Sequence, residues 1–156
     1  LGLGIGDVDL YAAFAWRFWQ LCRQGGTAGV VVPRSLVNSA GGVEWRKTVF
    51  SNATVEVVTL TNNRMWVFPI HPQFTVALVN FHKALPGIRE VRIAGPFSDG
   101  ESFVSGRSSM GSTSFEALAA ASTGAAVPNL PDALDAEIFT QLRASPRLDE
   151  RRPGWD

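Results

Sequence analysis

The apolar residues near the start of the chain recur at helical spacing. They include Leu10, Phe14, Phe18 and Leu21. Asp9 stands where an N-cap residue accepts hydrogen bonds from the first free backbone N–H groups, and two consecutive glycines end the pattern. Because further aromatic residues make most of the remaining circumference apolar, the pattern predicts a helix over 9–24 that is buried against more than one element, chiefly a sheet.

Short apolar runs predict the strands of that sheet. The run at 27–32, closed by Pro33, has the composition of a strand covered on both faces, and 55–61 is rich in β-branched residues. A third run at 74–81 follows a loop of about twelve residues without a helical pattern, which favours antiparallel pairing of the last two strands. With a short helix expected at 43–50, the order of elements predicts an α/β fold.

The pattern weakens after residue 86. We expect an edge strand at 88–94, and an irregular connection in the glycine- and serine-rich stretch 95–114. Two helices are predicted at 115–122 and 131–145. The second carries an apolar stripe of Leu134, Ile138 and Leu142.

Composition narrows the classes to which the chain can belong. Its 156 residues are enough for one domain, and a hydrophobic content of 46% excludes a disordered or collagen-like chain. No apolar run approaches the roughly 18 residues of a membrane-spanning helix, and no signal-peptide pattern is present, so we expect a cytoplasmic protein without membrane contact. Fourteen basic residues balance fourteen acidic ones, so charge by itself indicates no partner.

Few residues suggest metal or hydrolytic chemistry. Cys22 is the single cysteine, which excludes a disulfide framework. Neither His71 nor His82 has a cysteine or carboxylate at ligand spacing, so we expect no metal site. No serine lies in a G-x-S-x-G elbow.

Glycines and basic residues each allow a ligand-binding and a simpler interpretation. The glycines at 2, 4 and 6 lack the preceding strand that a phosphate loop needs, which favours a linker over 1–8. With no initiator methionine and a polar end, the chain is expected to be a segment of a longer one. Several basic residues are candidates for phosphate contacts, although solvated surface charge is the favoured interpretation. They are Arg46, Lys47, Arg64, Arg143, Arg147, Arg151 and Arg152.

The loop between the last two predicted strands, WVFPIHPQF at 66–74, combines three aromatic residues with two prolines. Phe68 within it is either packed back on the core, as most aromatic residues are, or held at the surface for a ligand. The residues of the loop alone favour packing.

Four stretches together resemble the second half of an amino-group DNA methyltransferase. They are DLYAAFAWRFWQLCRQGGTAGVVVPRSL, GGVEWRKTVF, VEVVTLTN and VFPIHPQFTVALVNF. The similarity is strongest to N6-adenine enzymes of restriction–modification systems, especially the fused type II kind in which one chain carries methyltransferase and target-recognition domains. It covers about residues 7–83.

The resemblance implies part of a doubly wound, S-adenosylmethionine-dependent methyltransferase sheet. In it, 9–24 is the helix after the catalytic loop, 27–32 the fifth strand, and 55–61 with 74–81 the final antiparallel pair. Neither the glycine-rich cofactor loop nor the Asn-Pro-Pro-Tyr catalytic loop of the family is in this sequence. No catalytic residue is therefore assigned to residues 9–83, and 84–156 is expected to be a helical extension leading toward a target-recognition domain.

The resemblance also implies roles for four residues. Phe68 stacks on a flipped adenine, Pro33 lies near the rim of the active site, and Leu10 and Phe14 help to line the pocket for the cofactor's adenine ring. Members of the family often carry an arginine and a lysine where this chain has Pro72 and Thr75. A phosphate contact from this loop is therefore not expected.

The implied partners are duplex DNA, the remainder of the methyltransferase domain and a target-recognition domain. We expect the chain alone neither to methylate DNA nor to bind S-adenosylmethionine tightly, and to self-associate through surfaces that the missing half would cover. A non-catalytic α/β module that binds protein or RNA is the alternative. A methyltransferase acting on RNA or protein amino groups shares the same chemistry.

Overall fold

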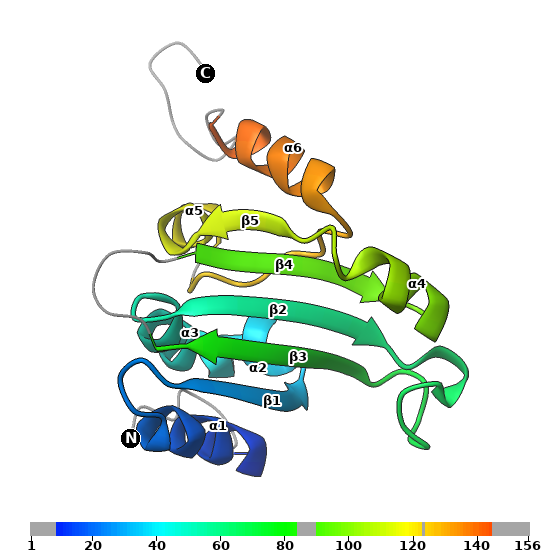
Figure 1. The fold of residues 1–156 in the computed structure, drawn as a ribbon, viewed down its shortest axis with the longest axis horizontal. Coiled ribbons are helices and arrows are strands. Elements are labelled where there is room, and N and C mark those ends of the chain that lie inside the picture. The colour runs from blue at the N-terminus through cyan, green and yellow to red at the C-terminus, as the bar shows by residue number, and fades with distance from the viewer. Residues whose placement is uncertain (1–8, 84–89, 123, 145–156) are drawn as a thin grey trace, which may run out of the picture.

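The computed structural model describes residues 9–83, 90–122 and 124–144, which form a mixed five-stranded sheet with helices around it (Figure 1). The strands are β1 (Thr27–Pro33), β2 (Thr54–Thr61), β3 (Thr75–His82), β4 (Glu90–Phe97) and β5 (Gly111–Ser114). The helices are α1 (Leu10–Leu21), α2 (Ser35–Asn38), α3 (Val43–Phe50), α4 (Gly100–Gly106), α5 (Phe115–Ala121) and α6 (Ala133–Ala144), with 3₁₀ turns at η1 (Ala40–Gly42) and η2 (Asn63–Met65). No helix in these ranges is long and apolar enough to cross a membrane.

The strand order is β1-β3-β2-β4-β5, and β3 is antiparallel to both of its neighbours. The predicted antiparallel pairing of β2 with β3 is confirmed, with Thr54 opposite His82 and Thr61 opposite Thr75. Beyond this pair, β4 is parallel to β2, and β5 is antiparallel to β4. The fold is therefore α/β, as the order of elements predicts, and the helix predicted at 43–50 is α3.

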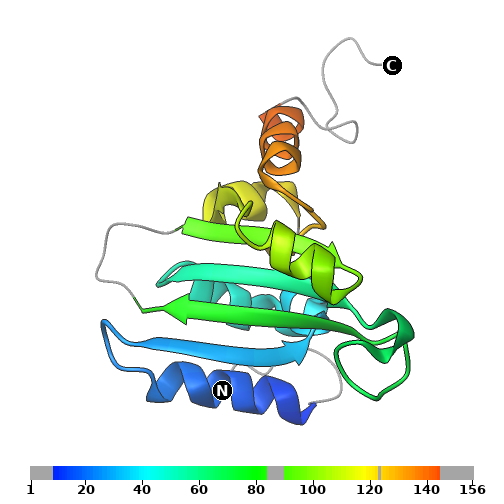
Figure 2. The same ribbon diagram turned by 45° about the vertical axis from the view of Figure 1, so that its right-hand side comes forward.

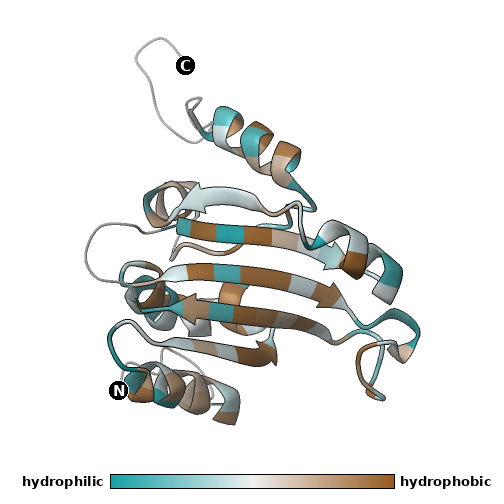
Figure 3. Cartoon of the chain, in the orientation of Figure 1, coloured by the Kyte–Doolittle hydropathy of each residue, from teal (hydrophilic) through white to brown (hydrophobic). Residues whose placement is uncertain are grey.

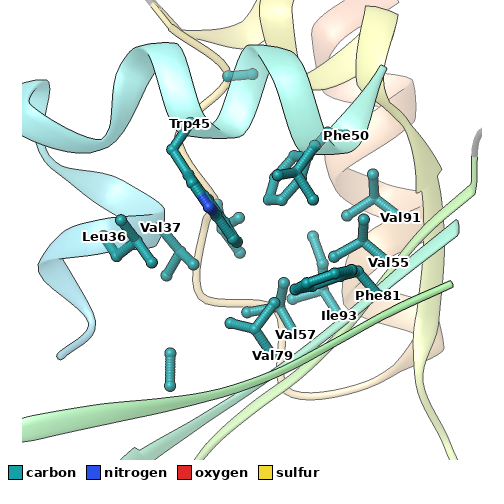
Figure 4. Packing of buried hydrophobic residues seen from close by; sticks show 14 of the residues in the cluster. Leu36, Val37, Trp45, Phe50, Val55, Val57, Val79, Phe81, Val91 and Ile93 are labelled. Atoms are coloured by element: carbon teal, nitrogen blue, oxygen red, sulfur yellow. The ribbon is translucent and has the colours of Figure 1, made fainter. Parts of the chain in front are cut away.

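Aromatic side chains join the helices to one face of the sheet (Figure 4). The ring of Phe81 on β3 lies 5.6 Å from that of Trp19 on α1 and 6.4 Å from that of Trp45 on α3, both edge-on. Phe50 adds a further edge contact to Trp45 at 6.2 Å. Edge-on aromatic pairs contribute about 0.5–1.5 kcal/mol each beyond the area they bury, so Phe81 links two helices to the middle of the sheet.

The face that α1 buries differs from the predicted one. Ala15 and Trp19 are buried, whereas the predicted stripe is exposed: Leu10 by 75%, Phe14 by 57%, Phe18 by 43% and Leu21 by 64%. The helix packs chiefly on β1 and α3, and its second apolar side is exposed. Asp9 occupies the N-cap position, but its side chain accepts no capping hydrogen bond.

The prediction that β1 is covered on both faces is wrong. Its residues alternate between exposed and partly buried, and no described strand pairs with its outer edge. Val31 is 58% exposed on the sheet face opposite α3, where a shallow groove of about 250 Å³ is lined by residues of three neighbouring strands. They are Gly29, Val30, Val31, Glu56, Val58, Leu78, Val79 and Asn80. Figure 3 shows apolar residues along β1, β2, β3 and β4.

The chain after residue 89 contributes strands as well as helices (Figure 2). The prediction of an edge strand is wrong, because β4 lies between β2 and β5. The stretch expected to be irregular contains β5 and α4, whose N-cap Asp99 accepts a hydrogen bond from the Ser102 N–H at 2.8 Å. The two predicted C-terminal helices are α5 and α6. The α6 stripe Leu134, Ile138 and Leu142 is exposed, while Ala136 is buried.

The predicted domain boundary near residue 83 remains a prediction. The sheet continues across it, since β2 pairs with β4. The proposed linker 1–8 and three of the candidate arginines, Arg147, Arg151 and Arg152, lie outside the described residues.

The open sheet face and the free edge of β1 lead to a prediction about association. We expect the chain to sediment as dimers or larger species at micromolar concentration, because an unpaired edge with no charged residue offers backbone groups to a second copy. Val31→Lys places a charge on this edge strand and should shift the chain toward monomer in analytical ultracentrifugation. A monomer for the unsubstituted chain would contradict the prediction.

Candidate functional site

The residues that follow β1 and β2 meet at one end of the sheet. Pro33 at the end of β1 pairs with Val76 of β3, and Thr61 at the end of β2 pairs with Thr75. The loop from 62 to 74 therefore begins and ends beside the carboxyl end of β1. A hydrogen bond of 3.0 Å from the Arg34 N–H to the Thr75 carbonyl joins the two sides.

An apolar groove of about 340 Å³ lies between this loop and β1. It is lined by Val31, Val32, Pro33, Phe68, Pro69, Ile70, Phe74, Thr75 and Val76, so its walls carry a single hydroxyl group. Phe68 is 37% exposed and Phe74 60% exposed. Phe68 is therefore partly packed against the protein, and more than a third of its surface is open to the groove and solvent.

Asn62 holds the loop that carries Phe68. Its side chain is fully buried and makes four hydrogen bonds to the loop backbone: Nδ2 donates to the carbonyls of Phe68 and Ile70, both at 3.0 Å, and Oδ1 accepts from the N–H groups of Val67 at 3.2 Å and Phe68 at 3.1 Å. An asparagine amide offers two donor hydrogens and one acceptor oxygen with two lone pairs, so its capacity is filled. Both backbone polar groups of Phe68 are thereby fixed.

Sequence reasoning missed Asn62. The signal was present, because a polar residue directly after a β-branched strand either faces solvent or bonds to the chain that follows. Only the path of the loop distinguishes the two. Trp66 adds a second tie, since its indole N–H donates to the Thr61 carbonyl at 2.7 Å.

A more polar pocket of about 390 Å³ adjoins the groove. Pro33, Phe74 and Thr75 line both. The remaining walls of the polar pocket are Asp9, Tyr11, Arg34, Ser35, Asn38 and Gln73. Its hydroxyl groups are already engaged with each other in part, because Ser35 Oγ donates to the Tyr11 hydroxyl at 2.9 Å.

The structure brings Phe68 and Pro33 together but not the two candidate cofactor residues. Leu10 and Phe14 lie on the exposed side of α1 and line neither the groove nor the polar pocket. The Phe14 ring lies 6.3 Å from that of Phe18 at an angle of 28°. The two rings form part of an exposed apolar surface on α1. The roles of all four residues remain predictions.

Arg46 does not reach solvent, so the prediction that it is a surface charge or a phosphate ligand is wrong. Its guanidinium is buried and donates to the carbonyls of Leu36 at 2.8 Å, Ser39 at 2.9 Å and Gly124 at 3.0 Å. Burial lowers the pKa of Arg46 to about 10, which still leaves it charged at neutral pH. The arginine joins α2 and η1 to the segment after α5.

The other basic candidates have ordinary surroundings. Lys47 is exposed and pairs with Glu44 at 3.2 Å, and the Arg143 guanidinium lies 5.4 Å from the centre of the Phe139 ring. Arg64 is exposed in η2. Within the described ranges, no three histidine, cysteine or carboxylate side chains gather as metal ligands would.

Comparison with known proteins gives structural likenesses only. No protein-family model and no curated protein matches the chain. Among solved structures, it is similar to the ATP-dependent Type ISP restriction-modification enzyme LlaBIII bound to DNA, with a TM-score of 0.41 and 12% identity over 56% of this chain. The chain spans 7% of the length of that enzyme. A likeness of this size assigns no function.

The hydrogen bonds of Asn62 predict the effect of removing them. Asn62→Ala removes all four hydrogen bonds to the loop backbone, and the Phe68 carbonyl keeps only the one from the Ile70 N–H at 2.8 Å. The substitution should lower the free energy of unfolding by about 2–3 kcal/mol. Amide hydrogen exchange at Val67 and Phe68 should accelerate at the same time. Asn63→Ala changes the exposed neighbour and is the control. Equal exchange rates at these amides in the two variants would contradict the assignment.

The buried guanidinium allows a second test of stability. Arg46→Met removes three hydrogen bonds to backbone carbonyls, of which Ser39 keeps a second one from the Gly42 N–H. We therefore expect urea denaturation to show a loss of about 3 kcal/mol in the free energy of unfolding. Lys47→Met removes an exposed charge next to it and should cost less than about 1 kcal/mol. If both substitutions had the same effect, Arg46 would not support the fold in the way described.

Proposed function

We propose that the chain is the C-terminal half of the catalytic domain of a DNA adenine-N6 methyltransferase of the restriction–modification type. The supporting observation is the apolar groove, in which an aromatic ring held by Asn62 shares the walls with the proline that ends β1. The groove is lined by both residues to which the sequence resemblance assigns a substrate contact, Phe68 and Pro33.

The chemistry of base methylation explains why such a groove is useful. The amino group of adenine cannot be reached inside a duplex, so an enzyme must swing the base out at a cost of a few kcal/mol. Stacking on an aromatic ring restores about 1–3 kcal/mol per base. Pro69 restricts the backbone next to Phe68, and the four hydrogen bonds of Asn62 restrict it further, so little entropy is lost when the base arrives.

The uncovered surfaces agree with a chain that forms half of a larger domain. The free edge of β1, the open sheet face and the exposed side of α1 are the places where the first strands and helices of a doubly wound domain would pack. Leu10 and Phe14 would then form one wall of the pocket for S-adenosylmethionine, which supplies the methyl group. The groups that hydrogen-bond the adenine N6 belong to a catalytic loop outside this sequence.

A second function has an observation of its own. Ile70 and Phe74 are 44% and 60% exposed beside Phe68, and an exposed apolar groove with these rims also fits an apolar side chain of a protein partner. In that case the chain would be a non-catalytic interaction module. An enzyme acting on RNA or protein amino groups would use the same groove with another substrate.

The test uses the complete gene product that contains residues 1–156, with a duplex carrying 2-aminopurine at the methylated position identified in the host genome. Phe68→Ala should reduce both the fluorescence increase on base flipping and the single-turnover methylation rate by about 10- to 100-fold, the equivalent of one lost stacking contact. The affinity for S-adenosylmethionine should stay within about twofold, because Phe68 is not a cofactor contact in this scheme.

Two further variants control the measurement. Phe68→Trp retains an aromatic face and should restore most of the flipping signal. Met65→Ala removes a more exposed apolar side chain outside the groove and should leave both readouts unchanged. If the unsubstituted protein methylates no nucleic acid or protein, the interaction module is the better assignment. If it methylates DNA and Phe68→Ala has no effect, the role of Phe68 is wrong.

A further inference from the structure

The polar pocket beside the groove contains a guanidinium without a described partner. Arg34 directly follows the last residue of β1, and its side chain lines the pocket together with Asn38 and Gln73. Its Nε is buried and makes no hydrogen bond. Buried polar groups in folded proteins are nearly always hydrogen-bonded, so an unpaired guanidinium N–H at the wall of a pocket indicates a ligand with acceptor oxygens.

The charges around Arg34 leave it free to bind an anion. The two ion pairs seen among the described residues are Lys47 with Glu44 and Arg92 with Glu56, and neither includes Arg34. Asp9 is the one carboxylate that lines the same pocket, and it is exposed to solvent. The nearby donors are the side-chain amides of Asn38 and Gln73, which can add neutral hydrogen bonds to an anion held by Arg34.

The groove and the polar pocket adjoin. Pro33, Phe74 and Thr75 lie in the walls of both, so a ligand in the groove is one residue away from the pocket. The groove is apolar and contains an exposed aromatic ring, whereas the pocket is polar and contains a cation. A nucleotide matches this arrangement, because its planar base offers an apolar face at one end and its phosphate offers charged acceptor oxygens at the other.

We propose that Arg34 binds the phosphate of the nucleotide whose base occupies the Phe68 groove. The proposal rests on the proposed function for the identity of the base, and on the polar pocket for the phosphate. Arg34 then serves as a substrate-binding residue that anchors the backbone of an everted nucleotide while Phe68 stacks on its base. This phosphate contact comes from the β1 side of the groove. It is distinct from a phosphate contact by the 66–74 loop, which is not expected because the loop carries Pro72 and Thr75 at the positions of the family's arginine and lysine.

The test measures binding of adenosine 5′-monophosphate, adenosine and inorganic phosphate to the 156-residue chain by ligand-observed NMR. We expect the monophosphate to bind about tenfold more tightly than adenosine, the equivalent of one charge-assisted contact, and inorganic phosphate to bind more weakly than the monophosphate. Arg34→Gln should abolish the difference in affinity between adenosine 5′-monophosphate and adenosine without changing the affinity for adenosine. Arg34→Lys should restore part of it, and Arg64→Gln, a matched change outside both pockets, should leave it intact.

Raising the salt concentration should reduce the advantage of the monophosphate and leave adenosine unaffected. Circular dichroism of each variant shows whether the fold is retained, and Arg34→Lys supplies the same comparison if Arg34→Gln does not fold. Equal affinities for the monophosphate and adenosine, or no binding of the monophosphate at about 10 mM, would overturn the proposal. So would inorganic phosphate that binds as tightly as the monophosphate.

The outcomes separate this proposal from the proposed function. If Phe68→Ala weakens the binding of neither ligand while Arg34→Gln still weakens the binding of the monophosphate, the phosphate site is supported and the stacking role of Phe68 is wrong. If Phe68→Ala weakens the binding of both ligands and Arg34→Gln weakens the binding of neither, the groove is supported as the site of the base and the phosphate site is wrong.

Discussion

The position of β3 between β1 and β2 is the constraint on which the rest of the structure depends. Because β3 is antiparallel to both neighbours, β1 and β2 run in the same direction, and their carboxyl ends lie on either side of the start of β3. The loop that joins β2 to β3 must therefore return next to the end of β1. A groove between that loop and β1 follows from the strand order, and the residue types of the loop decide that it is apolar.

The loop is held by a buried polar side chain rather than by apolar packing. A loop of this length that packed its aromatic residues into the core would bury them, and the groove would close. The buried side chain of Asn62 makes hydrogen bonds to the loop backbone, so the loop is held in place without burying the whole Phe68 side chain in the core. The same arrangement recurs at Arg46, where three carbonyls of irregular chain are satisfied by a single buried guanidinium. In both places a polar residue in the interior defines a segment that has little regular structure of its own.

Apolar surface is buried on one face of the sheet and partly exposed around β1 and α1. Helices α1 and α3 cover one face of the sheet through Trp19, Trp45 and Phe81. A second cluster that includes Phe97 and Phe103 covers part of the other face. The outer edge of β1 pairs with no described strand, and one side of α1 is exposed. An apolar helix side and an unpaired strand edge next to each other are expected where a further layer of the same sheet packs. The groove and the polar pocket lie at the carboxyl end of β1, which is where ligands bind in open α/β sheets.

The sequence by itself determined where the longer helices and strands lie, because their apolar periods and their glycine and proline boundaries are local, but it did not indicate α4 and β5. The helix at 43–50 has the predicted bounds, the strand predicted at 55–61 begins one residue earlier, and the strand predicted at 74–81 is displaced by one residue. Phe68 and Pro33 could be named as a pair only through a family resemblance, since about 35 residues separate them. Which side of α1 is buried, the place of β4 inside the sheet, the burial of Arg46 and the role of Asn62 were decided by the tertiary structure. Each depends on contacts between distant segments, and neither periodicity nor composition encodes which segments meet.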